Sequence, residues 1–247
     1  MSLPVHLHPD LAGVGVGDAV TLAGDEARHA VAVRRTQVGE RIVLTDGRGA
    51  RLTTRVTAVA KTRLEAVVEQ RVDDPEPVPR MTVVQPEPKG DRGELAVSPL
   101  PEIGAARIGP WAAERCVATW RGERADKGRA RWTATSRESA KQARRSWLPE
   151  VDPVADLAAV VAEVGRADLA VVLHEAPGGD TLADRPVEAA RHLLVVVGPE
   201  GGVTDPELAA LADAGARTVR LGAEVLRTST AGVAACAALL GRTERWR

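Results

Sequence analysis

The sequence contains no tyrosine and no phenylalanine, so its core has to be built from aliphatic side chains together with five tryptophans. Its two cysteines, Cys116 and Cys236, are too few for a disulfide scaffold and do not have zinc-ligand spacing. No apolar run approaches the roughly 20 residues of a membrane helix. The first ten residues also lack the basic and apolar regions of a secretory signal. We therefore expect a soluble, cytoplasmic globular protein.

Several catalytic and binding motifs are missing as well. The five histidines form neither H-x-x-x-H nor H-x-x-E-H, so we expect no protein-built metal site. The absence of G-x-S-x-G argues against a serine hydrolase of the α/β type. Neither the G-x-G-x-x-G fingerprint nor the G-K-[ST] end of a P-loop occurs, so neither a dinucleotide-binding enzyme nor a P-loop protein is indicated.

A proline-rich segment divides the 247 residues, which are enough for one large or two small domains. Residues 74–79 carry three prolines in alternation. Such a segment continues neither a helix nor a central strand, and it is typical of a stiff extended linker. The sequence therefore predicts one domain over residues 1–73 and a second over residues 80–247.

The two predicted domains differ in their hydrophobic pattern. The first has short β-like runs separated by turn signals and one helical stretch between Gly24 and Arg35, which favours a small β-barrel. Its runs are Val20–Leu22, Arg41–Leu44, Arg51–Val56 and Leu64–Val68. The second has continuous aliphatic runs, typical of a parallel sheet covered by helices. Its predicted strands are Met81–Gln85, Leu169–Leu173, Leu193–Val197 and Thr218–Leu221, and its predicted helices are Leu157–Val164, Pro206–Ala214 and Ser229–Leu240.

Charge is distributed unevenly along a chain whose net charge is −1. Residues 115–147 carry 10 Lys/Arg and 3 Asp/Glu, a local excess of +7. Such a segment attracts polyanions, because phosphate contacts supply most of the non-specific affinity for nucleic acid. An arginine-rich helical face exposed to solvent is the other interpretation, and charge alone leaves both open.

Three loops that follow buried strands are the strongest candidates for chemistry. In Gly198–Gly202, glycines allow the backbone to approach a ligand closely at the carboxyl end of a strand. The loop Leu221–Thr228 places Arg227 just before a helix, where the helix dipole disfavours positive charge, so this arginine suggests a bound anion or a reacting group. The third loop is Leu173–Glu175. Each loop alone is also compatible with a simple turn.

Together these residues resemble the RsmE family of SPOUT-class methyltransferases. The resemblance covers nearly the whole chain. It rests on Gly198-Pro199-Glu200-Gly201-Gly202 followed by Leu221-Gly222 and Val225-Leu226-Arg227-Thr228. Supporting segments are His29–Arg34, Lys89–Arg92, Glu114–Cys116 and Ser136–Arg145. Two prolines between Val97 and Gly104 depart from the family pattern and argue against a continuous helix there.

The resemblance implies a PUA-like β-barrel at residues 1–73 that helps to bind RNA, and an α/β SPOUT domain with a trefoil knot at residues 80–247. It implies S-adenosylmethionine as methyl donor, N3 of a uridine in 16S ribosomal RNA of the small ribosomal subunit as target, and a homodimer. The donor site would consist of Leu173, His174, Glu175, Gly198, Pro199, Glu200, Gly201, Gly202, Leu221, Gly222, Val225, Leu226 and Thr228.

Arg227 is predicted to be catalytic, as a donor to charge developing on the uracil, and Glu200 and Glu175 are candidates by type only for the general base. RNA contacts are predicted for Arg34, Arg35, Arg92, Arg115, Lys141, Arg144 and Arg145. Two other hypotheses stay open for the function: a SPOUT methyltransferase that acts on another RNA such as transfer RNA, and an RNA-binding relative without catalysis.

Overall fold

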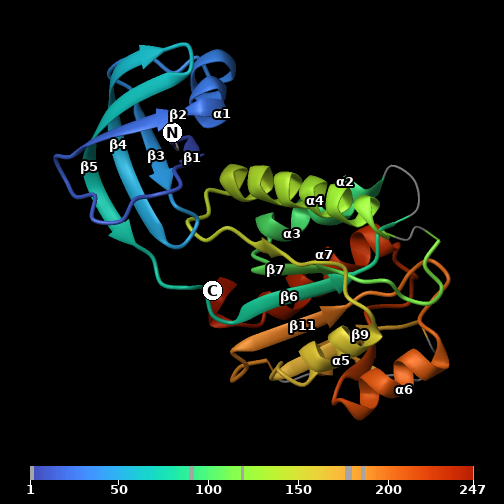
Figure 1. Ribbon diagram of the computed structural model, residues 1–247. Helices are drawn as coiled ribbons and strands as arrows, with labels where there is room; N and C mark the ends of the chain where they lie inside the picture. Colours follow the sequence, from blue (N-terminus) through green and yellow to red (C-terminus); the bar gives the residue numbers. More distant parts are fainter. Residues whose placement is uncertain (1–2, 89–91, 118–119, 176–179, 185–186, 247) are drawn as a thin grey trace. The chain divides into compact units, whose positions relative to one another are not determined.

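The computed structural model describes residues 3–88, 92–117, 120–175, 180–184 and 187–246 (Figure 1). The chain forms two compact units, Met1–Glu76 with Ala140–Leu148, and Pro77–Ser139 with Pro149–Arg247. The segment Ala140–Leu148 thus belongs to the first unit, whereas the predicted boundaries assign it to the second. It is attached by hydrogen bonds from Leu148 N to the oxygen of Gly47 (2.9 Å) and from Thr45 Oγ1 to the oxygen of Ser146 (3.1 Å).

The first unit is built on a curled five-stranded sheet with the order β1-β3-β4-β5-β2 (Figure 1). All neighbouring strands pair antiparallel except β1, which runs parallel to β3. The strand β1 has only three residues, too few for an alternating pattern to indicate it. The elements are β1 (Val5–Leu7), β2 (Ala19–Ala23), α1 (Gly24–Arg28), the π-helical turn η1 (His29–Val33), β3 (Arg41–Thr45), β4 (Ala50–Ala60) and β5 (Arg63–Asp73).

Alternation along these strands determines which side chains enter the core of the first unit. Leu52, Thr54 and Val56 of β4 are buried while Arg55 between them is exposed, as expected for a strand with one solvated face. The fully buried side chains of this cluster are aliphatic and include Leu22, Ile42, Leu44, Leu52 and Leu64. This confirms the expectation of an aliphatic core.

The second unit contains a seven-stranded sheet in which every neighbouring pair is parallel, with the order β10-β12-β9-β11-β6-β7-β8. This confirms the predicted α/β class. Its strands are β6 (Arg80–Gln85), β7 (Arg107–Pro110), β8 (Glu150–Val151), β9 (Leu169–Leu173), β10 (Asp180–Thr181), β11 (His192–Val196) and β12 (Arg217–Arg220). The threading of the knot stays a prediction.

Helices cover both faces of this sheet, so its central strands are buried on both sides. Leu193 and Val195 of β11 face a cluster with α2, α3 and α7, whereas Leu194 and Val196 face a cluster with α5 and α6. This is the reason for the continuous aliphatic runs in the sequence. The helices are α2 (Gly93–Val97), α3 (Pro99–Glu102), α4 (Glu123–Gln142), α5 (Leu157–Val164), α6 (Asp205–Asp213) and α7 (Thr228–Leu240), with short 3-10 turns at Leu182–Asp184 and Glu244–Trp246.

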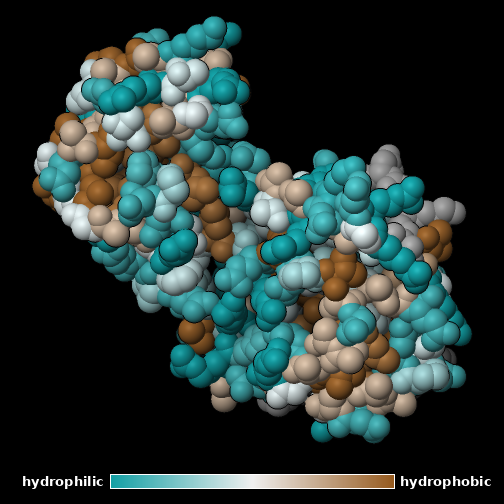
Figure 2. All heavy atoms as spheres, in the orientation of Figure 1, coloured by the Kyte–Doolittle hydropathy of each residue, from teal (hydrophilic) through white to brown (hydrophobic). Residues whose placement is uncertain are grey.

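The prolines between Val97 and Gly104 have the predicted effect. The helix α2 ends at Val97 and a separate one-turn helix, α3, begins at Pro99. The helix α4 spans 20 residues, whereas the sequence indicated a helix there only as one of two interpretations of the basic segment. Within the described residues no helix is both long and apolar enough to cross a membrane. Figure 2 shows hydrophilic residues over much of the visible face of each unit, with hydrophobic patches between them.

Candidate functional site

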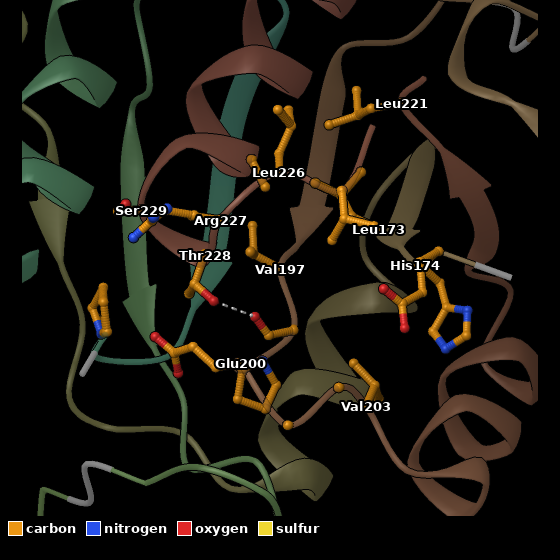
Figure 3. A pocket seen from close by; sticks show the side chains of 18 of the residues that line it. Leu173, His174, Val197, Glu200, Val203, Leu221, Leu226, Arg227, Thr228 and Ser229 are labelled. Carbon is orange, nitrogen blue, oxygen red and sulfur yellow. Dashed lines mark hydrogen bonds between the residues drawn. The ribbon is translucent and has the colours of Figure 1, made fainter. Parts of the chain in front are cut away.

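The parallel sheet brings the carboxyl ends of its strands to one edge, and a cavity of about 660 Å³ lies there (Figure 3). The loops after β9, β11 and β12 form most of its wall, with Pro88 and Arg92 after β6 and Arg115 after β7. Ligands of open α/β sheets bind at this edge, where the chain reverses its winding direction. In this sheet the winding direction changes at β6, because β9 and β11 lie on one side of β6 and β7 and β8 lie on the other.

All thirteen residues predicted to hold the methyl donor line this one cavity. The catalytic candidate Arg227 lines it too, as do Arg92 and Arg115 from the set predicted to contact RNA. Residues more than fifty positions apart in the chain therefore meet, as the three strand-end loops suggested. The donor-site residues that meet here are Leu173, His174, Glu175, Gly198, Pro199, Glu200, Gly201, Gly202, Leu221, Gly222, Val225, Leu226 and Thr228.

The loop Gly198–Gly202 is held in a tight turn by contacts that need glycine. Gly202 donates its N–H to the oxygen of Pro199 (2.9 Å) and has a φ of +76°, which side chains other than glycine rarely adopt. At Gly201 a Cβ would lie 2.9 Å from the Cβ of Arg115 and 3.1 Å from its backbone oxygen. Arg115 Nη1 also donates to the oxygen of Gly201 (3.2 Å). The segment after β7 is thus packed directly onto the loop.

The helix α6 fixes the far end of this loop. Thr204 is its N-cap and Glu207 completes a capping box, with Thr204 N donating to Glu207 Oε2 (2.8 Å). The other carboxylate oxygen of Glu207 accepts a hydrogen bond from Glu114 N (2.8 Å). One buried carboxylate therefore connects the start of α6 to the segment that carries Arg115.

The catalytic candidate Arg227 is the N-cap residue of α7, so the helix starts one residue earlier than predicted. Its neighbour Thr228 donates from Oγ1 to the oxygen of Gly198 (3.1 Å), which attaches the start of α7 to the glycine loop (Figure 3). The side chain of Arg227 is exposed. In Figure 3, Arg227 and Glu200 lie on one side of the cavity and His174 lies on the other.

Charged and apolar groups share the wall of the cavity. Its cationic side chains are Arg92, Arg115, Arg220 and Arg227, and its acidic ones are Glu175, Glu200 and Glu224. Leucines and valines from the same loops supply apolar surface. A wall of this kind, with a few polar groups at fixed places, is typical of a small-molecule site of 300–1,000 Å³.

Some of the lining residues were missed by the sequence analysis. Arg220 is the last residue of β12 and Ser229 is the second residue of α7, and both line the cavity. The others are Pro88, Val197, Val203, Ala223, Glu224 and Ala231. Val197, Val203, Arg220 and Ser229 each adjoin a predicted loop, so extending the loops by one residue would have included them. Ala223 and Glu224 lie inside the predicted loop Leu221–Thr228 but were not among its predicted donor-site residues.

The residues predicted to contact RNA have different surroundings. Arg34, Arg35 and Arg144 are exposed and Arg145 is half-buried; all four belong to the first unit rather than to the cavity. The predicted RNA contact of Lys141 has to be corrected. It is only 6% exposed, and its Nζ lies 2.7 Å from Glu26 Oε1. Since this ammonium group is buried against a carboxylate, it is not available to a phosphate. Residues Lys89–Asp91, which supported the family resemblance together with Arg92, lie outside the described residues.

Neither cysteine has the properties of a nucleophile. Burial raises the pKa of the Cys236 thiol to about 12. Burial also raises the pKa of Cys116 to about 11. Nearby glutamates raise this pKa as well, whereas a backbone hydrogen bond with Ala113 lowers it. The raised pKa values favour the protonated thiols near neutral pH, and neither cysteine lines the cavity. Among the described residues no group of three or more His, Cys, Asp or Glu side chains could hold a metal ion.

Two family models match the chain. An RNA methyltransferase domain matches residues 74–240, and an RNA methyltransferase PUA domain matches residues 22–69. Ribosomal RNA small subunit methyltransferase E of Mycobacterium tuberculosis is 44% identical over 242 residues, which is 96% of this chain and 90% of the relative. The Bacillus subtilis protein of the same name is 29% identical and covers 91% of this chain and 90% of its own length.

A solved structure supports the same conclusion. Ribosomal RNA small subunit methyltransferase E from Neisseria gonorrhoeae, bound to S-adenosyl methionine, superposes with a TM-score of 0.85 at 29% identity, covering 97% of this chain and 98% of that one. The fold is thus that of an RNA methyltransferase domain joined to a PUA domain. The chain belongs to the ribosomal RNA small subunit methyltransferase E family, which confirms the resemblance seen in its motifs.

Proposed function

We propose that this protein transfers the methyl group of S-adenosylmethionine to N3 of a uridine in 16S ribosomal RNA. The observation that carries the proposal is the convergence of three strand-end loops on one cavity in a chain of this family. Small-subunit ribosomal RNA is the substrate named for the relative at 44% identity, and S-adenosyl methionine is the ligand named for the N. gonorrhoeae structure. The N3 position follows from the resemblance to the RsmE family.

The residues of the cavity suit a nucleoside donor. Leu173, Leu221 and Leu226 offer apolar surface to an adenine ring, and the backbone groups of the glycine loop offer hydrogen bonds to its edge. Glu175 supplies a carboxylate of the kind that accepts hydrogen bonds from ribose hydroxyls. The thirteen residues predicted for the donor site are therefore proposed to hold it.

S-adenosylmethionine, when bound, supplies an electrophilic methyl group. The protein has to align the uracil for in-line attack and to assist the loss of the N3 proton. Alignment of this kind lowers a barrier by about 7–11 kcal/mol. As N3 loses its proton, negative charge develops on the uracil carbonyl oxygens, and Arg227 is proposed to donate N–H groups to them. One such donor contributes about 2.7–4 kcal/mol.

The N3 proton also needs an acceptor. Glu200 and Glu175 are the two carboxylates of the right type that the motifs include. We favour Glu200, because it shares the side of the cavity that carries Arg227. Glu200→Gln should then lower kcat more than Glu175→Gln does. An equal loss in both variants, or a larger loss at Glu175, would reverse this assignment.

The remaining proposals concern the RNA and the assembly. The first unit is proposed to hold the RNA, which agrees with its match to a PUA domain. Arg92 and Arg115 are proposed to contact the RNA close to the reacting base, since they line the cavity. We also propose that the protein acts as a homodimer, and in the cytoplasm, where small ribosomal subunits are found.

Transfer of radiolabelled methyl groups tests the proposal. Small ribosomal subunits that lack uridine N3 methylation are incubated with labelled S-adenosylmethionine, and the modified nucleoside is identified after digestion. Free 16S ribosomal RNA and transfer RNA are tested in parallel. We expect the label in 3-methyluridine from the subunits or from 16S ribosomal RNA.

The other outcomes separate the alternative functions. Label found only in transfer RNA, or on another atom, would keep the fold and overturn the substrate. If no label is transferred and S-adenosylmethionine does not bind in calorimetry, the chain is an RNA-binding relative and the enzymatic proposal is wrong.

A further inference from the structure

A second cavity of the second unit lies at the same edge of the parallel sheet as the first. Its volume is about 370 Å³, and it lies where β7 and β8 end, on the other side of β6 from β11. The walls come from the segment after β7, the loop after β8 and the start of α4. Small-molecule sites have volumes in this range. The residues that line it were not among those predicted to hold the methyl donor or to contact RNA.

The ring of Trp120 forms a fixed aromatic wall of this second cavity. It packs on α4 at Gly128, where a Cβ would overlap three atoms of the ring, so this position needs glycine. It also contacts the ring of Trp132 edge-to-face, with 4.9 Å between the centroids and 68° between the planes. Trp132 is fully buried and Trp120 is half-buried. Because the ring of Trp120 is already held in place, a flat ligand can stack on it at little cost in entropy.

The charged groups of this cavity do not neutralise one another. Asp126 and Arg129 lie three positions apart on α4, yet within the described part of the chain neither forms an ion pair. The Nε of Arg129 donates to the oxygen of Val151 (3.1 Å). Asp156 is the N-cap of α5, and its Oδ1 accepts from Ala159 N (2.9 Å). Asp126 therefore presents the carboxylate that, among the described residues, has no hydrogen-bond donor of its own.

One short segment separates the second cavity from the first. Ala112 lines the second and Arg115 lines the first, and three residues span at most about 11 Å. The segment is held in place, because Ala112 N donates to the oxygen of Ala155 (2.9 Å). Trp111 Nε1 donates to the oxygen of Val197 (3.0 Å), where the glycine loop begins. An RNA strand with its target base in the first cavity thus has a neighbouring nucleotide within reach of the second.

We propose that the second cavity binds a guanine base that neighbours the target uridine in the RNA strand. This inference rests on the proposed function and adds a feature to its substrate. Trp120 stacks on the base, and Asp126 accepts hydrogen bonds from its Watson–Crick edge, which is how proteins recognise unstacked RNA bases. Guanine is the RNA base with two adjacent N–H donors, at N1 and N2, that match both oxygens of one carboxylate. The terminal nitrogens of Arg129 serve the phosphate of the same nucleotide.

The charges of the cavity favour a neutral ring over an ion. A free anion would meet the carboxylates of Asp126 and Asp156, and a cation would meet the guanidinium of Arg129. An arginine or lysine side chain of a peptide could also stack on Trp120, but it would bring a like charge beside Arg129. Guanine is neutral and satisfies the carboxylate without a second positive charge.

Binding of mononucleotides tests the base pocket directly. Radiolabelled GMP, AMP, CMP and UMP are dialysed to equilibrium against the full-length protein with saturating S-adenosylmethionine. GMP should bind about 5- to 150-fold more tightly than the other three, as one bidentate contact to a base discriminates. Asp126→Asn should abolish this preference. Trp120→Leu should weaken GMP binding by about 5- to 150-fold, whereas Trp120→Phe, which still stacks, should lose much less.

Methyl transfer to small ribosomal subunits provides the second readout. Asp126→Asn and Trp120→Leu should each raise KM for the subunits at least about fivefold and leave KM for S-adenosylmethionine unchanged. A merely structural role of Trp120 would raise both KM values and lower the melting temperature. Asp126 is exposed, so its variant does not put the fold at risk. The matched control is Glu123→Gln, an exposed acid of the same helical turn outside the cavity, which should change neither KM.

The pocket is overturned if GMP is not preferred, if Trp120→Leu binds GMP like the wild type, or if N-acetylarginine amide binds at Trp120 in place of GMP. Its failure is distinguishable from a failure of the proposed function. A wild-type protein that methylates the subunits while both variants keep normal GMP binding and KM loses only the pocket. A wild-type protein that transfers no methyl group, but binds GMP in a way that needs Trp120 and Asp126, keeps the pocket and loses the enzymatic function.

Discussion

Glu26 should make the stability of the first unit depend on pH in the acid range. Its carboxylate is 19% exposed and lies 2.7 Å from Lys141 Nζ and 3.6 Å from His6 Nδ1, and it accepts a hydrogen bond from Leu7 N (3.2 Å). Burial alone would raise the pKa of Glu26, but His6, Lys141 and the Leu7 amide together lower it from 4.5 to about 2. The difference corresponds to about 3 kcal/mol, at 1.36 kcal/mol per pKa unit.

Proton binding determines whether stability rises or falls with pH. Between about pH 4.5 and pH 2 the unfolded chain binds a proton at Glu26 that the folded chain does not, so stability rises with pH in this range. The contribution is complete above pH 4.5 and is lost as the pH falls towards 2. Glu26→Gln should therefore cost about 3 kcal/mol at pH 7 and almost nothing near pH 2.

The assay is urea unfolding at pH 7, 5, 4 and 3, followed by pulsed hydrogen exchange in peptides from residues 41–73, which report the first unit by itself. Glu65→Gln is the matched control. Glu65 is 46% exposed in its pair with Arg63, and an exposed pair is worth about 1 kcal/mol or less. If Glu26→Gln lowers the free energy of unfolding equally at every pH, the effect is one of packing and the reasoning is refuted. A loss of unfolding free energy below about 1 kcal/mol at pH 7 would also refute it.

Three further predictions concern the second unit. Arg227→Ala should lower kcat of methyl transfer by about 10²–10³-fold and leave S-adenosylmethionine binding within about threefold, because the lost donor acts on charge that develops during the reaction; a wild-type kcat would contradict this. Gly201→Ala should weaken donor binding by about 5- to 150-fold in calorimetry, since its Cβ would lie 2.9 Å from the Cβ of Arg115 and overpacking costs about 1–3 kcal/mol. Gly165→Ala, where the nearest atom is 3.8 Å away, is its control and should bind normally. Cys236 should resist iodoacetamide in the native protein at pH 8 and react in denaturant, because burial raises its pKa to about 12; rapid native labelling would mean that α7 opens.

Many strands, helix caps and loops of the second unit could be predicted from the sequence alone. The aliphatic runs of β9 and β11 are continuous because both faces of these strands are covered, and the capping residues Thr204 and Glu207 are local in sequence. Glycines at Gly198–Gly202 mark a close approach of backbone that needs no knowledge of distant partners. These signals are local, so they predicted the α/β class and most of the residues that line the cavity.

The basic segment shows what local signals do not contain. The sequence presents Lys141, Arg144 and Arg145 as equivalent positive charges. Whether a lysine binds RNA or a carboxylate depends on what lies next to it, and Glu26 is 115 positions away. The same applies to Ala140–Leu148, which joins the first unit because Leu148 donates a hydrogen bond to Gly47 and Thr45 donates one to Ser146.

The sequence by itself determined the fold class and the strand-end loops, because hydrophobic period, caps and glycine turns depend on neighbours a few positions away. The motifs in those loops also indicated the family by resemblance. Only the tertiary structure decided which charges are compensated inside the protein and which remain at its surface. That outcome depends on distances between residues remote in sequence, since the energy of a charge pair changes with separation and burial far more than with residue type.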